Sequence, residues 1–496
     1  MPVIRNTFYL YLSYLSSLLL SLIQLKILSS FMEISELGSF FTIMAFSGII
    51  AQLLLMGLPL VFSRYLPKFE AEGERGKSKV LVSSSVILFI TLGAIINIIF
   101  LFIGYRIGFG IYREELIGRY LGIGMTVQLS VIFLTLLLNG FIGLRKMSYF
   151  ASLNILWLLL LTGMLYLFKN SLNVPLLFKL YLLSVLPSLI LAVIFLSRRI
   201  GWTHRIDKKV LKEVIPYWRY SVIQGILSPF SGYLDRLIVG YILGMGPVSL
   251  FVVAMRANLL ARRILAIPLQ ALAPELSYHW EKGREEVLGG DLWRMTKILF
   301  LFSCLLTILL FVLGREVILL IATPEYLRSL TLLRLIVFTL PILSLYTPIT
   351  LAMRSVGKIS LFIICDLVRF LSYILLIYPL GAKFGLVGVG VANILSFSLV
   401  LLFTLFYIIP YHTSLRMDWV FIIKTLLFTI ATGILGLFIL QRYSPSPIIG
   451  IIVSGLSIVI LFLVFFWKVS TKEEQAQFYR LFKRVQTLTG GFRGEG

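Results

Sequence analysis

Long apolar stretches separated by short polar connections follow one another along almost the whole chain. A helix that crosses a bilayer needs about 20 mainly apolar residues, and stretches of that length predict about fourteen such helices. They run Phe8–Leu28, Gly38–Val61, Val80–Ile103, Leu121–Phe141, Phe150–Phe168, Leu176–Leu196, Tyr217–Leu243, Val248–Leu272, Trp293–Leu313, Thr331–Met353, Ser360–Tyr378, Leu386–Ile409, Trp419–Leu440 and Ile448–Trp467. The connections leave no room for a soluble catalytic domain. We therefore expect an all-α polytopic membrane protein that is not an enzyme.

The two halves of the chain resemble each other. An offset of about 210 residues places Gly57–Leu60 opposite Ala266–Leu269 and Gly73 opposite Gly283. Parallel repeats of this kind are typical of transporters whose halves enclose a cavity. We predict two six-helix bundles around a central cavity, formed by residues 1–213 and 214–412, while residues 413–496 supply two further helices and a basic cytoplasmic tail.

Charge changes this picture by fixing the sides of the membrane. The net charge is +23 and only 14% of residues are charged. Basic residues gather in alternate connections, which indicates the cytoplasmic side of a membrane rather than nucleic-acid binding. These connections are 64–79, 145–146, 198–212 and 282–284. We expect a multi-pass protein of the cell membrane with both termini in the cytoplasm.

Polar residues at helical spacing mark one face of two predicted helices. Gln224, Ser228, Ser231 and Asp235 follow at steps of four, three and four residues, so they stack on one face of helix 217–243. Ser13, Ser17 and Gln24 form a similar face on helix 8–28. We interpret the two faces as opposite cavity walls, with ordinary helix packing as the alternative.

Three basic residues within the predicted helices are candidates for substrate binding. Arg256 is the ninth residue of helix 248–272, which places it about 13 Å from the helix start at about 1.5 Å per residue. Lys26 and Arg236 lie near outer helix ends, where extension of the side chain to water is the alternative. Cations in a low-dielectric cavity suit a phosphate-bearing substrate. With them we place Gln224 and Asp235 in the substrate-binding set.

Asp366 and Arg369 lie three residues apart on one predicted helix. They indicate either a structural ion pair or a site for ion coupling. Arg262 approaches the cytoplasmic interface, where it either follows the positive-inside pattern or attracts an anionic headgroup. The two cysteines lie in apolar stretches and the three histidines in separate connections, so we expect no metal site and no cofactor.

Two segments resemble the polysaccharide-transporter branch of the multidrug/oligosaccharidyl-lipid/polysaccharide (MOP) exporter superfamily. Ile27–Ala45 resembles the first loop of that branch, and Asp235–Pro247 is similar to the junction of its seventh and eighth helices. The resemblance implies an oligosaccharide flippase that moves a lipid-linked oligosaccharide from the inner to the outer leaflet. It also implies membrane lipids and polysaccharide-assembly proteins as partners. Helix 8–28 lacks the early Arg-Asp pair of the lipid II flippases, which disfavours a peptidoglycan precursor as cargo.

Two other function classes remain open. A cation-coupled multidrug antiporter of the same superfamily would need acidic residues deep in the first bundle, and none lies at mid-membrane there. A membrane glycosyltransferase or ligase would need a large outer loop, and the outer connections are short.

The predicted topology has a direct test. In otherwise cysteine-free protein in intact cells, a membrane-impermeant thiol reagent should label a cysteine at position 36 and spare one at position 204. The reverse pattern would place the termini outside.

Overall fold

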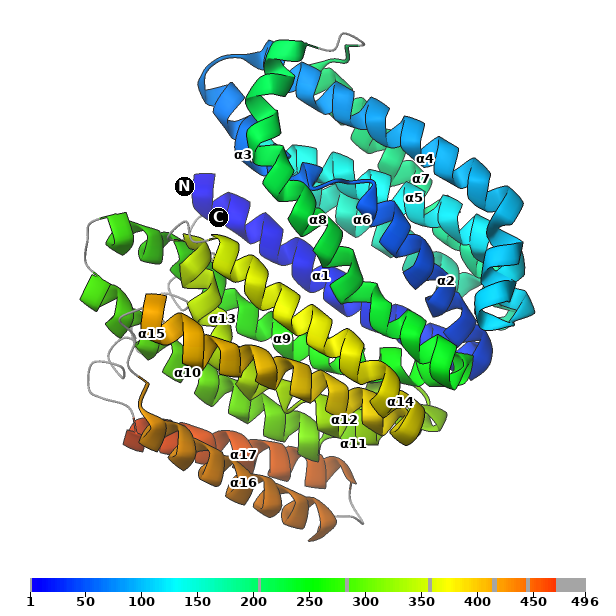
Figure 1. Ribbon diagram of the computed structural model, residues 1–496. Helices are drawn as coiled ribbons and strands as arrows, with labels where there is room; N and C mark the ends of the chain where they lie inside the picture. Colours follow the sequence, from blue (N-terminus) through cyan, green and yellow to red (C-terminus); the bar gives the residue numbers. More distant parts are fainter. Residues whose placement is uncertain are drawn as a thin grey trace, which may run out of the picture. The chain divides into compact units, whose positions relative to one another are not determined.

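Helices make up the regular structure of the chain. The computed structural model describes residues 2–203, 207–281, 285–355, 359–412, 417–442 and 447–469, and these contain no strand. The described residues divide into two compact units (Figure 1). The first comprises Met1–Arg256, Ile318–Leu332 and Tyr373–Ala392, and the second comprises Ala257–Val317, Leu333–Ser372 and Asn393–Gly496. The all-α prediction is confirmed, whereas the bundle boundaries at residues 213 and 412 stay predictions.

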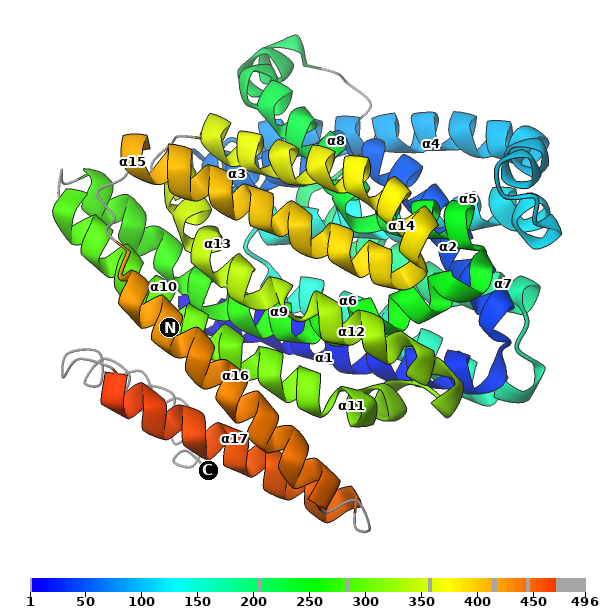
Figure 2. The same cartoon turned by 60° about the horizontal axis from the view of Figure 1, so that its bottom comes forward.

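The first unit is built from long helices packed in pairs. α4 packs on α5, α5 on α7, α1 on α6, and α2 on both α5 and α8 (Figures 1 and 2). Large aromatic side chains such as Phe62, Phe141 and Phe178 are buried between these helices. The helices are α1 (Pro2–Phe31), α2 (Ile34–Leu53), α3 (Leu58–Ala71), α4 (Arg75–Tyr112), α5 (Glu115–Gly143), α6 (Met147–Leu167), α7 (Val174–Ile200), α8 (Lys208–Leu243) and the first part of α9 (Met245–Glu281).

The second unit is built around α10. This helix packs on α13, α16 and α17, and the last two pack on each other (Figure 2). The remaining elements are α10 (Glu285–Val312), α11 (Gly314–Ile321), a 3-10 turn (Pro324–Ser329), α12 (Leu330–Ile336), α13 (Thr339–Ser355), α14 (Ile359–Phe403), a π-helical turn (Thr404–Ile408), α15 (Ile409–His412), α16 (Trp419–Arg442) and α17 (Pro447–Val469). α11, α12 and α14 contribute residues to both units, and the 3-10 turn lies in the first unit.

Ten helices of the described residues are long and apolar enough to cross a membrane, or eleven if the bent pair 324–336 and 339–353 is one span. The multi-pass architecture is thereby confirmed, and the number fourteen stays a prediction. Part of the difference lies in α14, which counts once but turns at Gly385 (φ 62°). In a straight helix Arg369 and Phe397 would be about 42 Å apart, yet the Arg369 guanidinium lies 5.4 Å from the Phe397 ring centroid. α14 therefore doubles back, and its two arms match predicted helices 360–378 and 386–409.

The predicted helix 38–61 is wrong as one continuous element, because the backbone breaks after α2. Met56 and Gly57 adopt left-handed conformations with φ of 45° and 71°, and α3 starts immediately afterwards with Pro59 in its first turn. The break exposes the carbonyl of Met56, which accepts a 2.7 Å hydrogen bond from the Trp218 indole of α8. The segment Ala266–Leu269, its predicted repeat partner, instead continues as helix within α9.

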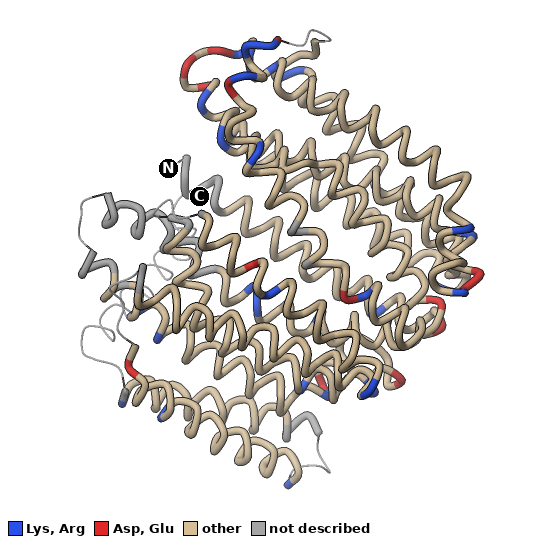
Figure 3. The backbone as a smooth tube through the Cα atoms, in the orientation of Figure 1, with Lys and Arg blue, Asp and Glu red and all other residues tan. Residues whose placement is uncertain are grey.

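Charged residues of the first unit gather at the helix ends, and few interrupt the helices (Figure 3). Several residues on which the sequence analysis relied lie outside the described residues. They are His204, Arg205, Gly283 with its neighbours Lys282 and Arg284, and the basic tail after Val469.

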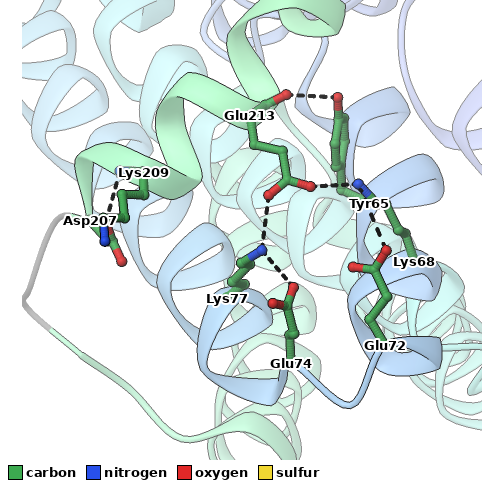
Figure 4. A network of polar contacts seen from close by, with 8 residues as sticks. All are labelled: Tyr65, Lys68, Glu72, Glu74, Lys77, Asp207, Lys209 and Glu213. Carbon is green, nitrogen blue, oxygen red and sulfur yellow. Dashed lines mark hydrogen bonds and ion pairs between the residues drawn. The ribbon is translucent and has the colours of Figure 1, made fainter.

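An ionic network joins the start of α8 to the end of α3 and the start of α4 (Figure 4). The Glu213 carboxylate lies 2.6 Å from Lys68 Nζ and 3.1 Å from Lys77 Nζ, and the Tyr65 hydroxyl donates to the Glu213 carbonyl at 3.0 Å. The hydrogen bond from Lys68 is the main cause that lowers the pKa of Glu213, and the same bond raises the pKa of Lys68. The network therefore holds the start of α8 against α3 and α4 at neutral pH.

Gly57→Ala should destabilise the protein markedly. A left-handed conformation costs a non-glycine residue about 1–3 kcal/mol, and the added Cβ would lie 2.2 Å from the Ser221 carbonyl oxygen. Thermal unfolding of the detergent-purified variant measures the loss. Gly76→Ala is the control, because its Cβ would meet nothing within 4 Å. Equal stability of the two variants would contradict the close approach of α8 to the break.

Glu213→Gln should lower the unfolding temperature by a few degrees at neutral pH, because it removes the charge that both lysines contact. Since the folded-state pKa of Glu213 is lowered, its contribution is complete above the ordinary carboxyl value of 4.5 and is lost as pH falls through the folded value. The difference between the variant and the native protein should thus close on acidification and shrink in high salt. Glu72→Gln is the control, since Glu72 lies 3.9 Å from Lys68 only. A difference that persists at low pH would exclude the ionic explanation.

Candidate functional site

The candidate site of the first unit starts on the face of α8 that meets α2. Arg236 packs on the ring of Tyr233, one helical turn earlier, with its guanidinium carbon 5.4 Å from the ring centroid. The Tyr233 hydroxyl accepts a hydrogen bond from Gln52 of α2 at 3.4 Å. Asp235 is buried with 7% of its surface exposed, and because it follows Tyr233 by two residues it lies on a different side of α8. Predicted residue Arg236 therefore lies beside the contact of α8 with α2, whereas Asp235 is buried on another side of α8.

Gln224 lies on the same helix and is partly buried. It precedes Asp235 by three turns, or about 16 Å along the axis at about 1.5 Å per residue. A single small group does not bridge that distance, so Gln224 and Asp235 would contact different parts of a large ligand. The side chains of Ser228 and Ser231, between them, lie outside the described residues.

Arg256 lies at the end of the α9 segment that belongs to the first unit, and it is partly buried. Its guanidinium is within electrostatic range of the Tyr181 hydroxyl on α7. The Tyr181 ring packs on Phe40 of α2 at 5.4 Å, and Phe40 packs on Phe178 at 5.3 Å. Arg256 is thus partly buried within α9, and its charge acts on the Tyr181 hydroxyl. Its contact with substrate stays a prediction.

Lys26 has a structural role that the sequence did not suggest. Its ammonium donates to the carbonyls of Leu319 and Ala322 at 2.7 and 2.6 Å, where α11 ends. The last carbonyls of a helix lack partners within the helix and carry partial negative charge, so a cation stabilises them. Lys26 therefore fastens α1 to the segment 318–332, and a direct contact with substrate stays a prediction.

The predicted cavity wall on α1 is wrong for Ser13 and Gln24. Asn154 of α6 donates to the hydroxyls of Ser13 and Ser17 at 2.8 and 2.9 Å, and Gln24 donates to the Thr162 hydroxyl at 2.9 Å. Ser13 is fully buried and Gln24 is 7% exposed. These polar residues pack α1 on α6, as small polar residues often do in membranes. Polar residues at helical spacing share one face of their helix. The spacing does not show whether another helix or water covers that face.

Asp366 and Arg369 lie in the second unit, together with Arg262. Arg262 donates to the Thr339 hydroxyl at 3.0 Å, and its guanidinium carbon lies 5.0 Å from the Phe397 ring centroid, on the same ring that Arg369 approaches. Arg262 is partly buried, whereas its neighbour Arg263 is exposed. We predicted Arg262 at the membrane interface from its position in the sequence. That position does not reveal that α14 doubles back and brings Phe397 close to Arg262. Whether Asp366 and Arg369 couple an ion stays a prediction.

The sequence analysis missed the rings that Arg236 and Arg369 approach, Tyr233 and Phe397, and it missed Gln52, which donates to the Tyr233 hydroxyl. Only Tyr233 had a usable signal, since it precedes Arg236 by three residues and therefore shares its face. Within the described residues no group of three or more His, Cys, Asp or Glu side chains could hold a metal ion.

The chain is similar in sequence to a family of known proteins and to one membrane protein. A family model described as polysaccharide biosynthesis protein matches residues 3–280. An uncharacterised membrane protein of Methanocaldococcus jannaschii is 22% identical over 425 residues, which cover 80% of this chain and 82% of the relative.

Solved structures share the fold. A lipid II flippase MurJ in an inward closed conformation has a TM-score of 0.72 at 15% identity, over 94% of this chain and 99% of that one. An inward-facing multidrug resistance MATE family transporter of the MOP superfamily has a TM-score of 0.64 at 16% identity, over 80% and 97%. A MOP superfamily transporter from Pyrococcus furiosus has a TM-score of 0.58 at 15% identity, over 81% and 94%. At these identities the likeness shows the fold alone.

Proposed function

Because the chain belongs to the polysaccharide biosynthesis protein family, we propose that it is a flippase that translocates a lipid-linked oligosaccharide from the cytoplasmic to the outer leaflet by alternating access. Family membership supports the polysaccharide-transporter branch, and the fold shared with a MurJ flippase and with a MATE transporter of the MOP superfamily agrees with it. The proposed location is the cell membrane, with both termini in the cytoplasm and with polysaccharide-assembly proteins as further partners.

One observation carries the proposal: Arg256 is partly buried, within electrostatic range of the Tyr181 hydroxyl, on a helix segment whose neighbouring residues Phe251–Ala254 are buried and apolar. A charge within a membrane helix costs about 2.5–3.5 kcal/mol on insertion scales, so such a residue is a candidate for a functional role. A guanidinium forms two parallel hydrogen bonds to phosphate or carboxylate oxygens, which suits the phosphate linkage of a lipid-linked glycan.

The other residues would serve the same ligand in different ways. Asp235 and Gln224 would accept or donate hydrogen bonds to sugar hydroxyls along α8, since they lie about 16 Å apart on that helix. Arg236 would add positive charge near Tyr233. Lys26 would act indirectly, because its ammonium already holds the end of α11.

A cation-coupled multidrug antiporter is the alternative, and the likeness to a MATE family transporter supports its fold. Such an antiporter would need acidic groups deep in the helices that carry the cation. In α1 to α7 the acidic residues lie in helix ends and connections, such as Glu36 and Glu115 in the first turns of α2 and α5. This distribution favours an anionic cargo over a cationic one.

Arg256 gives the test of the proposal. Arg256→Ala should remove most of the delivery of lipid-linked oligosaccharide to the outer leaflet, because it removes the charge and its hydrogen bonds. Arg256→Lys should retain part, because the charge remains and the bidentate geometry is lost. Transport is measured with purified protein in liposomes, after the amount of inserted protein has been equalised.

Arg263→Ala is the matched control, since Arg263 is an exposed arginine seven residues later on α9. It should transport at the native rate. A correctly inserted Arg256→Ala protein with native transport would contradict the proposed role. If that variant fails to accumulate while Arg263→Ala is normal, Arg256 is a structural residue.

A further inference from the structure

A second group of cationic and aromatic side chains lies within the second unit. We define the arginine–aromatic cluster as Arg262 of α9, Tyr346 of α13, and Asp366, Arg369 and Phe397 of α14. The guanidinium carbons of Arg262 and Arg369 lie 5.0 and 5.4 Å from the centroid of the Phe397 ring. The Tyr346 ring packs on Phe397 with centroids 6.4 Å apart. Two guanidinium groups thus converge on one aromatic surface.

The fold assembles the cluster from positions that are far apart in the sequence. The turn of α14 at Gly385 brings Arg369 and Phe397 together, although 28 positions separate them. The Thr339 hydroxyl, at the start of α13, accepts a hydrogen bond from Arg262 at 3.0 Å and so fixes the direction of this side chain. Phe397 and Tyr346 are 3% and 8% exposed. The rings are therefore rigid supports, while the two arginines and Asp366 remain partly exposed.

The charge of the cluster favours an anionic ligand. Tyr346 is within electrostatic range of Arg262, Arg369 and Asp366, which are two cations and one anion. The face of an aromatic ring attracts a cation and leaves its charge in place. Each guanidinium has five N–H donors in a planar fork, so two of them offer a broad set of donors to oxyanions.

From this geometry we propose that the arginine–aromatic cluster is a second binding site, which takes an oxyanion of the ligand. The chemistry fits either the diphosphate of a lipid linkage or the carboxylate of an acidic sugar. The proposal deepens the proposed function and rests on it for the nature of the ligand, but the site lies in a different unit from Arg256. Purely structural packing of α9, α13 and α14 by the same side chains is the competing explanation.

Binding to the full-length protein in detergent separates these explanations. Isothermal titration calorimetry would use inorganic pyrophosphate, glucuronate and, as the neutral probe, glucose. The measurements would be made in an Arg256→Ala background, so that any signal from the first unit is removed. At least one anionic probe should bind, and glucose should not. Binding of pyrophosphate alone would identify the linkage as the source of the oxyanion, whereas binding of glucuronate alone would identify an acidic sugar.

Arg262→Gln and Arg369→Gln should each weaken binding of the anionic probe at least tenfold. Arg334→Gln is the matched control, because Arg334 of the same unit lies 5.3 Å from the Phe311 ring centroid and donates to the Phe311 carbonyl at 3.2 Å. It removes an equivalent arginine–phenylalanine contact outside the cluster and should leave binding unchanged.

Two results would overturn the inference: absence of binding by any anionic probe, or equal affinities in the cluster variants and the Arg334→Gln control. If the glutamine variants do not fold, Arg262→Lys and Arg369→Lys decide, since they keep the charge and should still weaken binding by loss of the fork. Native affinity in the lysine variants would then contradict the site. Native oligosaccharide transport by Arg256→Ala together with probe binding at the cluster would reject the proposed role of Arg256 and leave the second site standing.

Discussion

The core of a bilayer contains no water, so each polar group within it must find its partner inside the protein. That constraint decides which helices are neighbours in the first unit. Asn154 holds α1 to α6 through two serine hydroxyls, and Trp218 of α8 covers the carbonyl that the break after α2 exposes. Lys26 donates hydrogen bonds to two carbonyls at the end of α11. Each hydrogen bond between membrane helices contributes about 0.6 kcal/mol on average, so these bonds select the arrangement more than they stabilise it.

The same constraint gives a transporter its means of recognition. Most charged residues of the first unit lie at helix ends, where water solvates them. Within the helices, Arg236 of the first unit packs on the Tyr233 ring, and Arg262 and Arg369 of the second unit approach the Phe397 ring. A ring lowers the cost of a cation in a low dielectric without neutralising it. Under the proposed function, an anionic ligand would bind to these cations.

The sequence predicted the helical class, the multi-pass architecture and the family, because hydropathy and segment length are properties of each stretch alone. It also separated the two arms of α14 by their apolar patterns. It did not predict the break at Gly57, since the surrounding residues are as apolar as a continuous span. It misassigned Ser13 and Gln24 because their partners lie on α6, more than 130 residues away. Contacts between distant helices depend on the packing of the whole unit, which local periodicity does not contain.

Direct observation of lipid movement tests the central claim that this protein flips an anionic, lipid-linked oligosaccharide. Liposomes that contain the purified protein would carry a polyisoprenyl diphosphate-linked oligosaccharide with a fluorescent label, and a membrane-impermeant quencher would report the fraction in the outer leaflet. The protein should accelerate the passage of this lipid between leaflets relative to protein-free liposomes, and it should not accumulate a hydrophobic cation in response to an ion gradient. Accumulation of the cation with no acceleration of the glycolipid would contradict the account and identify a drug antiporter.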